Sequence, residues 1–212
     1  MLNFKLTPHH TGFALWGDYP TLNRLHAFIH EVVAESSIIE DKESFVLGLA
    51  YDVRKAFEGQ RSESYIDQGD DRCKIFGVDI LWPVVLVQVG ILRHAMAFMP
   101  TSRLDQATMF ELEHVVESAV RSATPGTADA IIHQMRQIGA MPYQHIEIVL
   151  DSRCRYFIER PATKRLAVLS KLMETFDPMY LFLAERGAKL RPGVIKPTDF
   201  DVGDNTWPDF KW

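Results

Sequence analysis

Residues 79–99 read DILWPVVLVQVGILRHAMAFM, and this stretch decides the fold. It is apolar on nearly every face of a helical projection, which is typical of a helix in the centre of a domain. Its valine-rich first half also fits a buried strand, because hydrophobic periodicity alone does not separate the two. The good helix formers that follow favour a helix, which Pro100 would end. The apolar run at 80–92 is too short to cross a bilayer, which takes about 20 residues.

Around this central helix, the sequence pattern predicts a small sheet and a mostly helical body. Short apolar runs at 2–7 and 12–16 surround a polar turn and indicate an N-terminal hairpin. Residues 73–78 would add one further antiparallel strand, and the polar stretch 59–72 would form a loop. The expected fold class is therefore α+β. Periodicity and stop signals predict helices at 20–35, 42–58, 103–123, 127–138, 143–159, 162–176 and 178–186.

Several residues mark the expected helix ends. Asp18 stands where it can cap the first helix, and Gly59 is a natural stop for the second. Ser102, with Asp105 three residues later, resembles a capping box in which aspartate replaces glutamate. The connections between helices are short, so we expect one compact α+β domain over residues 1–187.

Composition narrows the class of protein. The 212 residues carry a formal charge of -5 and are 47% hydrophobic, which excludes a disordered chain. The acidic balance, 28 Asp and Glu against 23 Lys and Arg, argues against a dedicated nucleic-acid binder. Two widely spaced cysteines, with no signal-peptide pattern at residues 1–10, predict a cytoplasmic protein without a membrane anchor.

Eight histidines raise the hypothesis of a metal site. His26 and His30 are four residues apart on a predicted helix, so both rings could reach one ion. Glu111 and His114 form a Glu-x-x-His pair, a spacing used in di-metal helix bundles. Helical projections place these side chains at flank or solvent positions rather than facing the core. We therefore predict no cofactor, and a divalent metal only under an enzyme alternative.

Arg153 is the most unusual single residue. It falls close to the middle of the apolar stripe of its predicted helix, where an unpaired guanidinium would cost several kcal/mol. One interpretation is a structural ion pair, with Glu111 as a partner. The other is an anion-binding arginine that faces a cleft.

Two groups of aromatic residues suggest binding surfaces. Trp16 and Asp18 could form a lip at a strand-to-helix turn, although turn formation, capping and core packing explain them more simply. Residues 188–212 read as an irregular, acidic and aromatic tail that carries Trp207, Phe210 and Trp212. Exposure of this many aromatic side chains to water is unfavourable. We therefore expect the tail to wrap the domain or to dock on a partner.

The sequence shows no G-x-S-x-G elbow, Walker A loop or G-x-G-x-x-G fingerprint. We therefore expect a non-enzymatic protein–protein interaction module of the immunity, adaptor or regulatory type, whose partner is another protein or a second copy. The first alternative is a helical, metal-dependent hydrolase-like enzyme that uses the histidine and glutamate residues above. The second is a nucleic-acid-associated factor that uses the basic segment 153–165.

Overall fold

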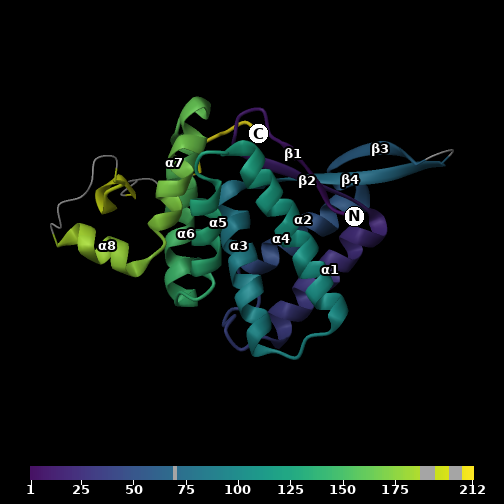
Figure 1. Ribbon diagram of the computed structural model, residues 1–212, viewed down its shortest axis with the longest axis horizontal. Helices are drawn as coiled ribbons and strands as arrows, with labels where there is room; N and C mark the ends of the chain where they lie inside the picture. The colour runs from purple at the N-terminus through teal and green to yellow at the C-terminus, as the bar shows by residue number, and fades with distance from the viewer. Residues whose placement is uncertain (69–70, 187–193, 201–206) are drawn as a thin grey trace.

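The computed structural model describes residues 1–68, 71–186, 194–200 and 207–212. The predicted α+β class is confirmed: a helical body carries a small antiparallel sheet (Figure 1). The helices are α1 (Tyr19–Glu35), α2 (Phe45–Lys55), α3 (Trp82–Ala95), α4 (Arg103–Ala123), α5 (Ala128–Ile138), α6 (Tyr143–Glu159), α7 (Ala162–Glu174) and α8 (Pro178–Glu185), with short helical turns η1 (Ala56–Gln60), η2 (Met96–Phe98) and η3 (Pro197–Phe200).

The sheet has four strands in the order β1-β2-β4-β3, and every neighbouring pair is antiparallel. The hairpin and the further strand were predicted, but the loop expected at 59–72 was wrong. Most of it forms an outer strand and the start of its neighbour. Periodicity gave no signal there because this outer strand has exposed side chains on both faces. The strands are β1 (Asn3–Leu6), β2 (Gly12–Asp18), β3 (Ser62–Gln68) and β4 (Asp71–Leu81).

The stretch 79–99 is divided between two elements. Strand β4 continues to Leu81, and α3 begins at Trp82, so the helix predicted from Asp79 starts three residues late. A buried strand and a buried helix both appear in the sequence as a continuous apolar run. The boundary between β4 and α3 could therefore not be predicted from the sequence. The helix itself occupies the centre of the body, as expected.

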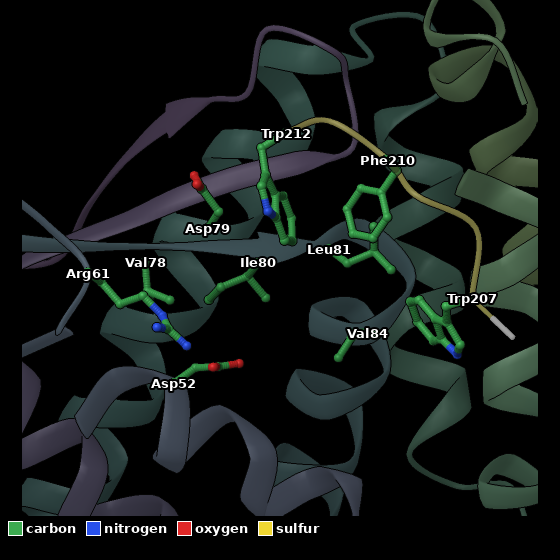
Figure 2. A pocket seen from close by; sticks show the side chains of 10 residues that line it. All are labelled: Asp52, Arg61, Val78, Asp79, Ile80, Leu81, Val84, Trp207, Phe210 and Trp212. Carbon is green, nitrogen blue, oxygen red and sulfur yellow. The ribbon is translucent and has the colours of Figure 1, made fainter. Parts of the chain in front are cut away.

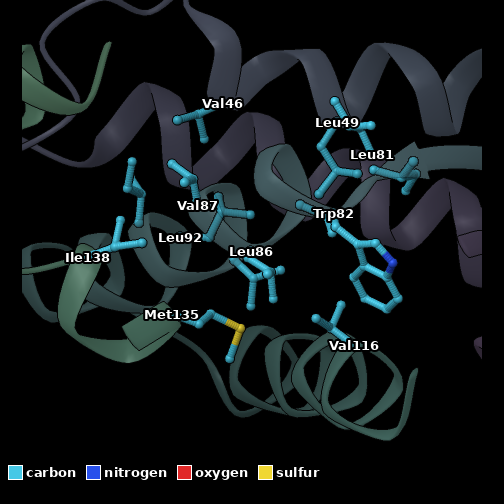
Figure 3. Packing of buried hydrophobic residues seen from close by; sticks show 14 of the residues in the cluster. Val46, Leu49, Leu81, Trp82, Leu86, Val87, Leu92, Val116, Met135 and Ile138 are labelled. Carbon is cyan, nitrogen blue, oxygen red and sulfur yellow. The ribbon is translucent and has the colours of Figure 1, made fainter. Parts of the chain in front are cut away.

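The core gathers around α3. This helix packs against α1, α2, α4, α5, α6 and α7, and its side chains are buried on almost every face. Figure 3 shows Trp82, Leu86 and Leu92 of α3 among residues from the surrounding helices. The buried Gln88 amide on the same helix donates to the Phe45 carbonyl at 2.8 Å, so its nitrogen is satisfied.

The helix ends follow the local signals in the sequence. Asp18 caps α1 by accepting from the Thr21 N–H at 2.8 Å. Ser102 and Asp105 form the reciprocal capping box at the start of α4. Gly59 adopts a φ of 77°, a left-handed conformation that suits glycine, and turns the chain from η1 toward β3.

Candidate functional site

A cleft lies where β3 no longer covers β4. The β3–β4 ladder ends at Ser62 and Gly77, whereas β4 continues to Leu81. Residues 78–81 therefore pair with β2 on one side, and no described strand pairs with their other edge. A cavity of about 460 Å³ follows this open edge (Figure 2). Its volume falls in the range of ligand-binding pockets.

The open edge presents to the cleft backbone groups that have no partner strand among the described residues. The Trp82 N–H donates to the Thr11 carbonyl beside β2 at 3.0 Å. Backbone groups alternate in direction along an antiparallel strand, so the amides of Val78 and Ile80 also face β2. The amides of Asp79 and Leu81 then face the cleft. Such an edge is a template on which another extended segment can pair.

Side chains on the two faces of β4 line the cleft differently. Val78 and Ile80 point to the side on which Asp52 of α2 and Arg61 lie (Figure 2). Asp79 points to the opposite side, as alternate residues of a strand must. Each face of the open edge therefore carries one carboxylate.

Both carboxylates lie in surroundings that disfavour their charge. Burial raises the pKa of Asp52 above its ordinary value, and the nearby cations Arg61 and Lys55 oppose this shift. Burial alone raises the pKa of Asp79. A cation beside either group would favour its charged form, and on the Asp52 side Arg61 already supplies one.

Three aromatic side chains of the predicted tail border the cleft: Trp207, Phe210 and Trp212. Figure 2 shows Trp212 on the same side of β4 as Asp79. The rings of Phe210 and Trp212 meet edge to face at 5.1 Å. Aromatic faces of this kind attract a lysine ammonium or an arginine guanidinium.

The described C-terminal residues lie against the body. The Thr11 hydroxyl donates to the Lys211 carbonyl at 3.4 Å, which brings the last residues beside the N-terminal hairpin. Residues 187–193 and 201–206 lie outside the described part of the chain, so the predicted tail is observed only in pieces.

A second, smaller hollow continues the cleft past Trp207. Its volume is about 280 Å³, and Trp207 and Val84 belong to both hollows. The smaller hollow is mostly apolar but carries two more carboxylates, those of Glu147 and Asp151. The two hollows adjoin at Val84 and Trp207, and their described linings hold four carboxylates and one guanidinium, that of Arg61. The second hollow is lined by Phe45, Val84, Glu147, Leu150, Asp151, Cys154 and Trp207.

Trp16 and Asp18, the lip predicted at the strand-to-helix turn, do not line the cleft. The half-buried Trp16 ring lies over Gly77, where an added Cβ would come within 2.5 Å of the ring. Trp16 is therefore a cover for the sheet, and Asp18 is the cap of α1.

Arg153 is buried, with 4% of its surface exposed, as its place in the apolar stripe predicted. Its guanidinium donates to the Ser152 hydroxyl at 2.8 Å and to the Thr175 carbonyl at 3.4 Å, and it lies 3.9 Å above the Phe200 ring. Burial lowers the pKa of Arg153 to about 10. The suggested partner Glu111 was wrong, because that carboxylate binds a cation on α1. Arg153 lines neither hollow.

The residues of the metal hypothesis are only partly brought together. The rings of His26 and His30 lie 4.5 Å apart on α1. Glu111 forms an ion pair with Arg24 at 2.8 Å, and His114 is exposed on α4. Within the described residues, no group of three or more histidine, cysteine, aspartate or glutamate side chains is placed to hold a metal ion.

Sequence reasoning missed the polar residues of the cleft. Asp52 reads as an ordinary surface partner of Lys55, and Arg61 falls in the stretch expected to be a loop. Of these residues, only Asp79 is recognisable as unusual in the sequence, because its carboxylate interrupts an apolar run between Val78 and Ile80.

Fold and cleft together define an α+β chain with an acidic, aromatic-walled site at an open sheet edge. The chain belongs to the family described as Domain of unknown function (DUF6904), whose model matches residues 2–212. No curated protein and no solved structure matches it. None of the helices in the described ranges combines the length and apolar character needed to cross a membrane.

Proposed function

We propose that the protein is a non-enzymatic protein–protein interaction module that binds an extended, basic segment of its partner along the open edge of β4. One observation carries the proposal: the Asp79 and Leu81 amides face an edge that no described strand covers, with a partly buried carboxylate on each side of it. Addition of a strand to such an edge is a recurring mode of peptide recognition.

The side chains around the edge specify what the added strand should carry. Alternate residues of the incoming strand point to opposite faces, so one would approach Asp52 and its neighbour would approach Asp79. Two consecutive lysine or arginine residues match this arrangement. The Trp212 ring beside Asp79 adds a cation–π contact worth about 0.5–1 kcal/mol at an exposed site.

The second hollow favours a protein segment over a small organic cation. Because both hollows share Val84 and Trp207, a ligand that leaves the first can continue into the second. An extended chain spans such a track, and the apolar wall near Glu147 and Asp151 suits the methylene stem of another basic side chain. Neither the histidines nor the basic segment 153–165 contributes a lining residue to the first hollow.

We further propose that this interaction takes place in the cytoplasm. The observation that supports this compartment is the state of the two thiols: Cys73 and Cys154 are both free. Free cysteines suit a reducing environment.

Fluorescence anisotropy with a labelled hexalysine peptide tests the proposal. Wild-type protein should bind it, and Asp52→Asn and Asp79→Asn should each weaken binding about five- to tenfold, since each removes one compensating charge. Asp129→Asn is the matched control, because Asp129 is a well-exposed carboxylate on α5. Equal binding by wild type and both cleft variants would overturn the proposal, as would equal affinity for hexaglutamate. Competition by free lysine amide as strong as that of the peptide would assign the cleft to a small cation instead.

A further inference from the structure

A second open edge lies on the outer side of β3. All described side chains from 62 to 67 are exposed, including Tyr65 at 50% and Ile66 at 42%. Figure 1 shows the β3–β4 hairpin projecting from the helical body. This edge faces away from the uncovered part of β4, although Arg61, just before β3, also lines the cleft.

The two outer strands of the sheet differ in how well their free edges are protected from pairing with another strand. Strand β1 has four residues, and α4 packs beside it with Glu111 accepting the Leu2 N–H at 2.7 Å. Strand β3 pairs over seven residues without a bulge, and it contains neither proline nor lysine. Short length, cover, bulges, proline and lysine are the usual ways in which a monomer protects an edge. Among the described residues, nothing covers the outer side of β3, and its only protection is the charge of Glu63 and Asp67.

The direction of the backbone groups follows from the register. The Asp79 amide faces away from β2, so the Gly77 amide does as well and bonds toward β3. Its partner Ser62 then faces inward, together with Ser64. The backbone groups of Glu63, Tyr65 and Asp67 therefore face outward, free to pair with another strand.

Charge selects the occupant and its register. A twofold axis perpendicular to the sheet pairs one residue with itself. A pair centred on Tyr65 would set Glu63 against Asp67 of the second copy, which is repulsive. A pair centred on Ser64 sets Arg61 against Asp67 of the second copy, and symmetry repeats this ion pair. In the single chain the Arg61 side chain lies on the Asp52 side of the cleft, so it would turn toward Asp67 of the second copy when the pair forms. The backbone at Arg61 is extended, with φ −131° and ψ −154°, and so continues the strand.

We infer that β3 is a self-association surface, which joins two copies of the chain in an antiparallel strand pair centred on Ser64. The pair would cover part of the exposed Tyr65 and Ile66 surface and would satisfy the outward backbone groups on both copies. Because the contact is confined to one hairpin, we expect a weak, reversible interface. Asp79 takes no part in it, whereas Asp52 would lose the nearby charge of Arg61.

Sedimentation equilibrium of the full chain tests this inference through a charge swap. Wild type should dimerise, and Asp67→Arg should raise the dissociation constant at least about tenfold by placing two arginines opposite each other twice. The double variant Arg61→Asp with Asp67→Arg exchanges the charges and should restore dimerisation. Asp129→Arg, with the same charge change on α5, should leave it unaffected.

Circular dichroism establishes that each variant is folded before it is compared. A wild-type chain that stays monomeric at several hundred micromolar would overturn the inference. The same conclusion would follow if Asp67→Arg dimerised as tightly as wild type, or if the charge swap failed to restore a dimer that Asp67→Arg had lost.

Discussion

The Trp207 indole N–H donates to the Asp151 carboxylate at 2.5 Å and so fastens the C-terminal segment to α6. The bond lies where the two hollows meet, because Trp207 lines both. Asp151 is also held by Arg155 at 3.1 Å on the next turn of the same helix. Trp207 therefore lies where the two hollows meet, and the Asp151 carboxylate holds its indole N–H there.

Trp207→Phe should test the importance of that bond. The variant keeps an aromatic ring but loses the indole donor, so we expect a loss of about 1 kcal/mol in the free energy of unfolding. Hexalysine affinity should fall a few-fold because the ring shared by the two hollows is no longer fixed. Urea denaturation and anisotropy measure the two effects. Trp212→Phe is the control for the urea measurement alone, since Trp212 donates to none of the described residues but lines the cleft. Equal losses of stability in the two variants would contradict this role of Trp207.

The cleft carboxylates should reduce stability at neutral pH. Burial raises the folded pKa of Asp52 and Asp79 above the ordinary 3.8, so the folded state holds these protons more tightly than the unfolded state. The free energy of unfolding then falls as the pH rises from about 3.8 through the raised pKa, and it stays lowered above that pH.

Asp52→Asn and Asp79→Asn should therefore unfold at higher urea concentration than wild type at pH 7. The difference should disappear near pH 3, where both states of the wild type are protonated. Binding of hexalysine by wild type should follow the opposite trend and strengthen as the pH rises through the same window. If the asparagine variants were less stable than wild type at pH 7, the cost of burying the charged carboxylates would not be the dominant effect at these positions.

A close approach of two helices should make Gly90 intolerant of a side chain. A Cβ at this position in α3 would lie 2.1 Å from the Met135 carbonyl oxygen of α5. Backbone must move to relieve that contact, so Gly90→Ala should cost about 1–3 kcal/mol or more. Gly126→Ala is the control, because a methyl group there would meet none of the described side chains or backbone within 4 Å. Equal denaturation midpoints for the two variants would refute the close approach.

The two thiols should differ in reactivity. Cys154 is 1% exposed, and burial strongly raises its pKa, so little thiolate forms there at neutral pH. Cys73 lies on β4 and is only partly buried. Native protein treated with iodoacetamide should therefore gain one carbamidomethyl group, located at Cys73 by peptide mass mapping, and a second only after unfolding. Modification of Cys154 first would contradict the packing of α6.

Much of the fold was readable because its helices bury one face. The limits of α6 coincide with the predicted 143–159, where the apolar stripe is regular. Strand β3 was missed because exposed strands need no alternation of polar and apolar residues. The boundary before Trp82 was missed because burial on all sides removes periodicity from strand and helix alike.

The candidate site was less readable, because it depends on contacts between distant segments. The density of aromatic residues near the C-terminal end of the sequence drew attention to Trp207 and Trp212. Asp52 and Asp79 come from a helix and a strand, and only the folded chain shows that they flank one edge. The β3–β4 ladder ends at Ser62 because the chain turns at Gly59 just before β3. The sequence analysis treated Gly59 only as the residue that stops a helix.

Hydrogen exchange of the β4 amides with and without hexalysine tests the central claim most directly. The Asp79 and Leu81 amides face the open edge, so a strand added there should slow their exchange at least about tenfold. The amides of Val78 and Ile80 already face β2 and serve as internal references whose exchange should not change. Peptide binding that leaves Asp79 and Leu81 exchanging at their free rates would contradict strand addition at this edge.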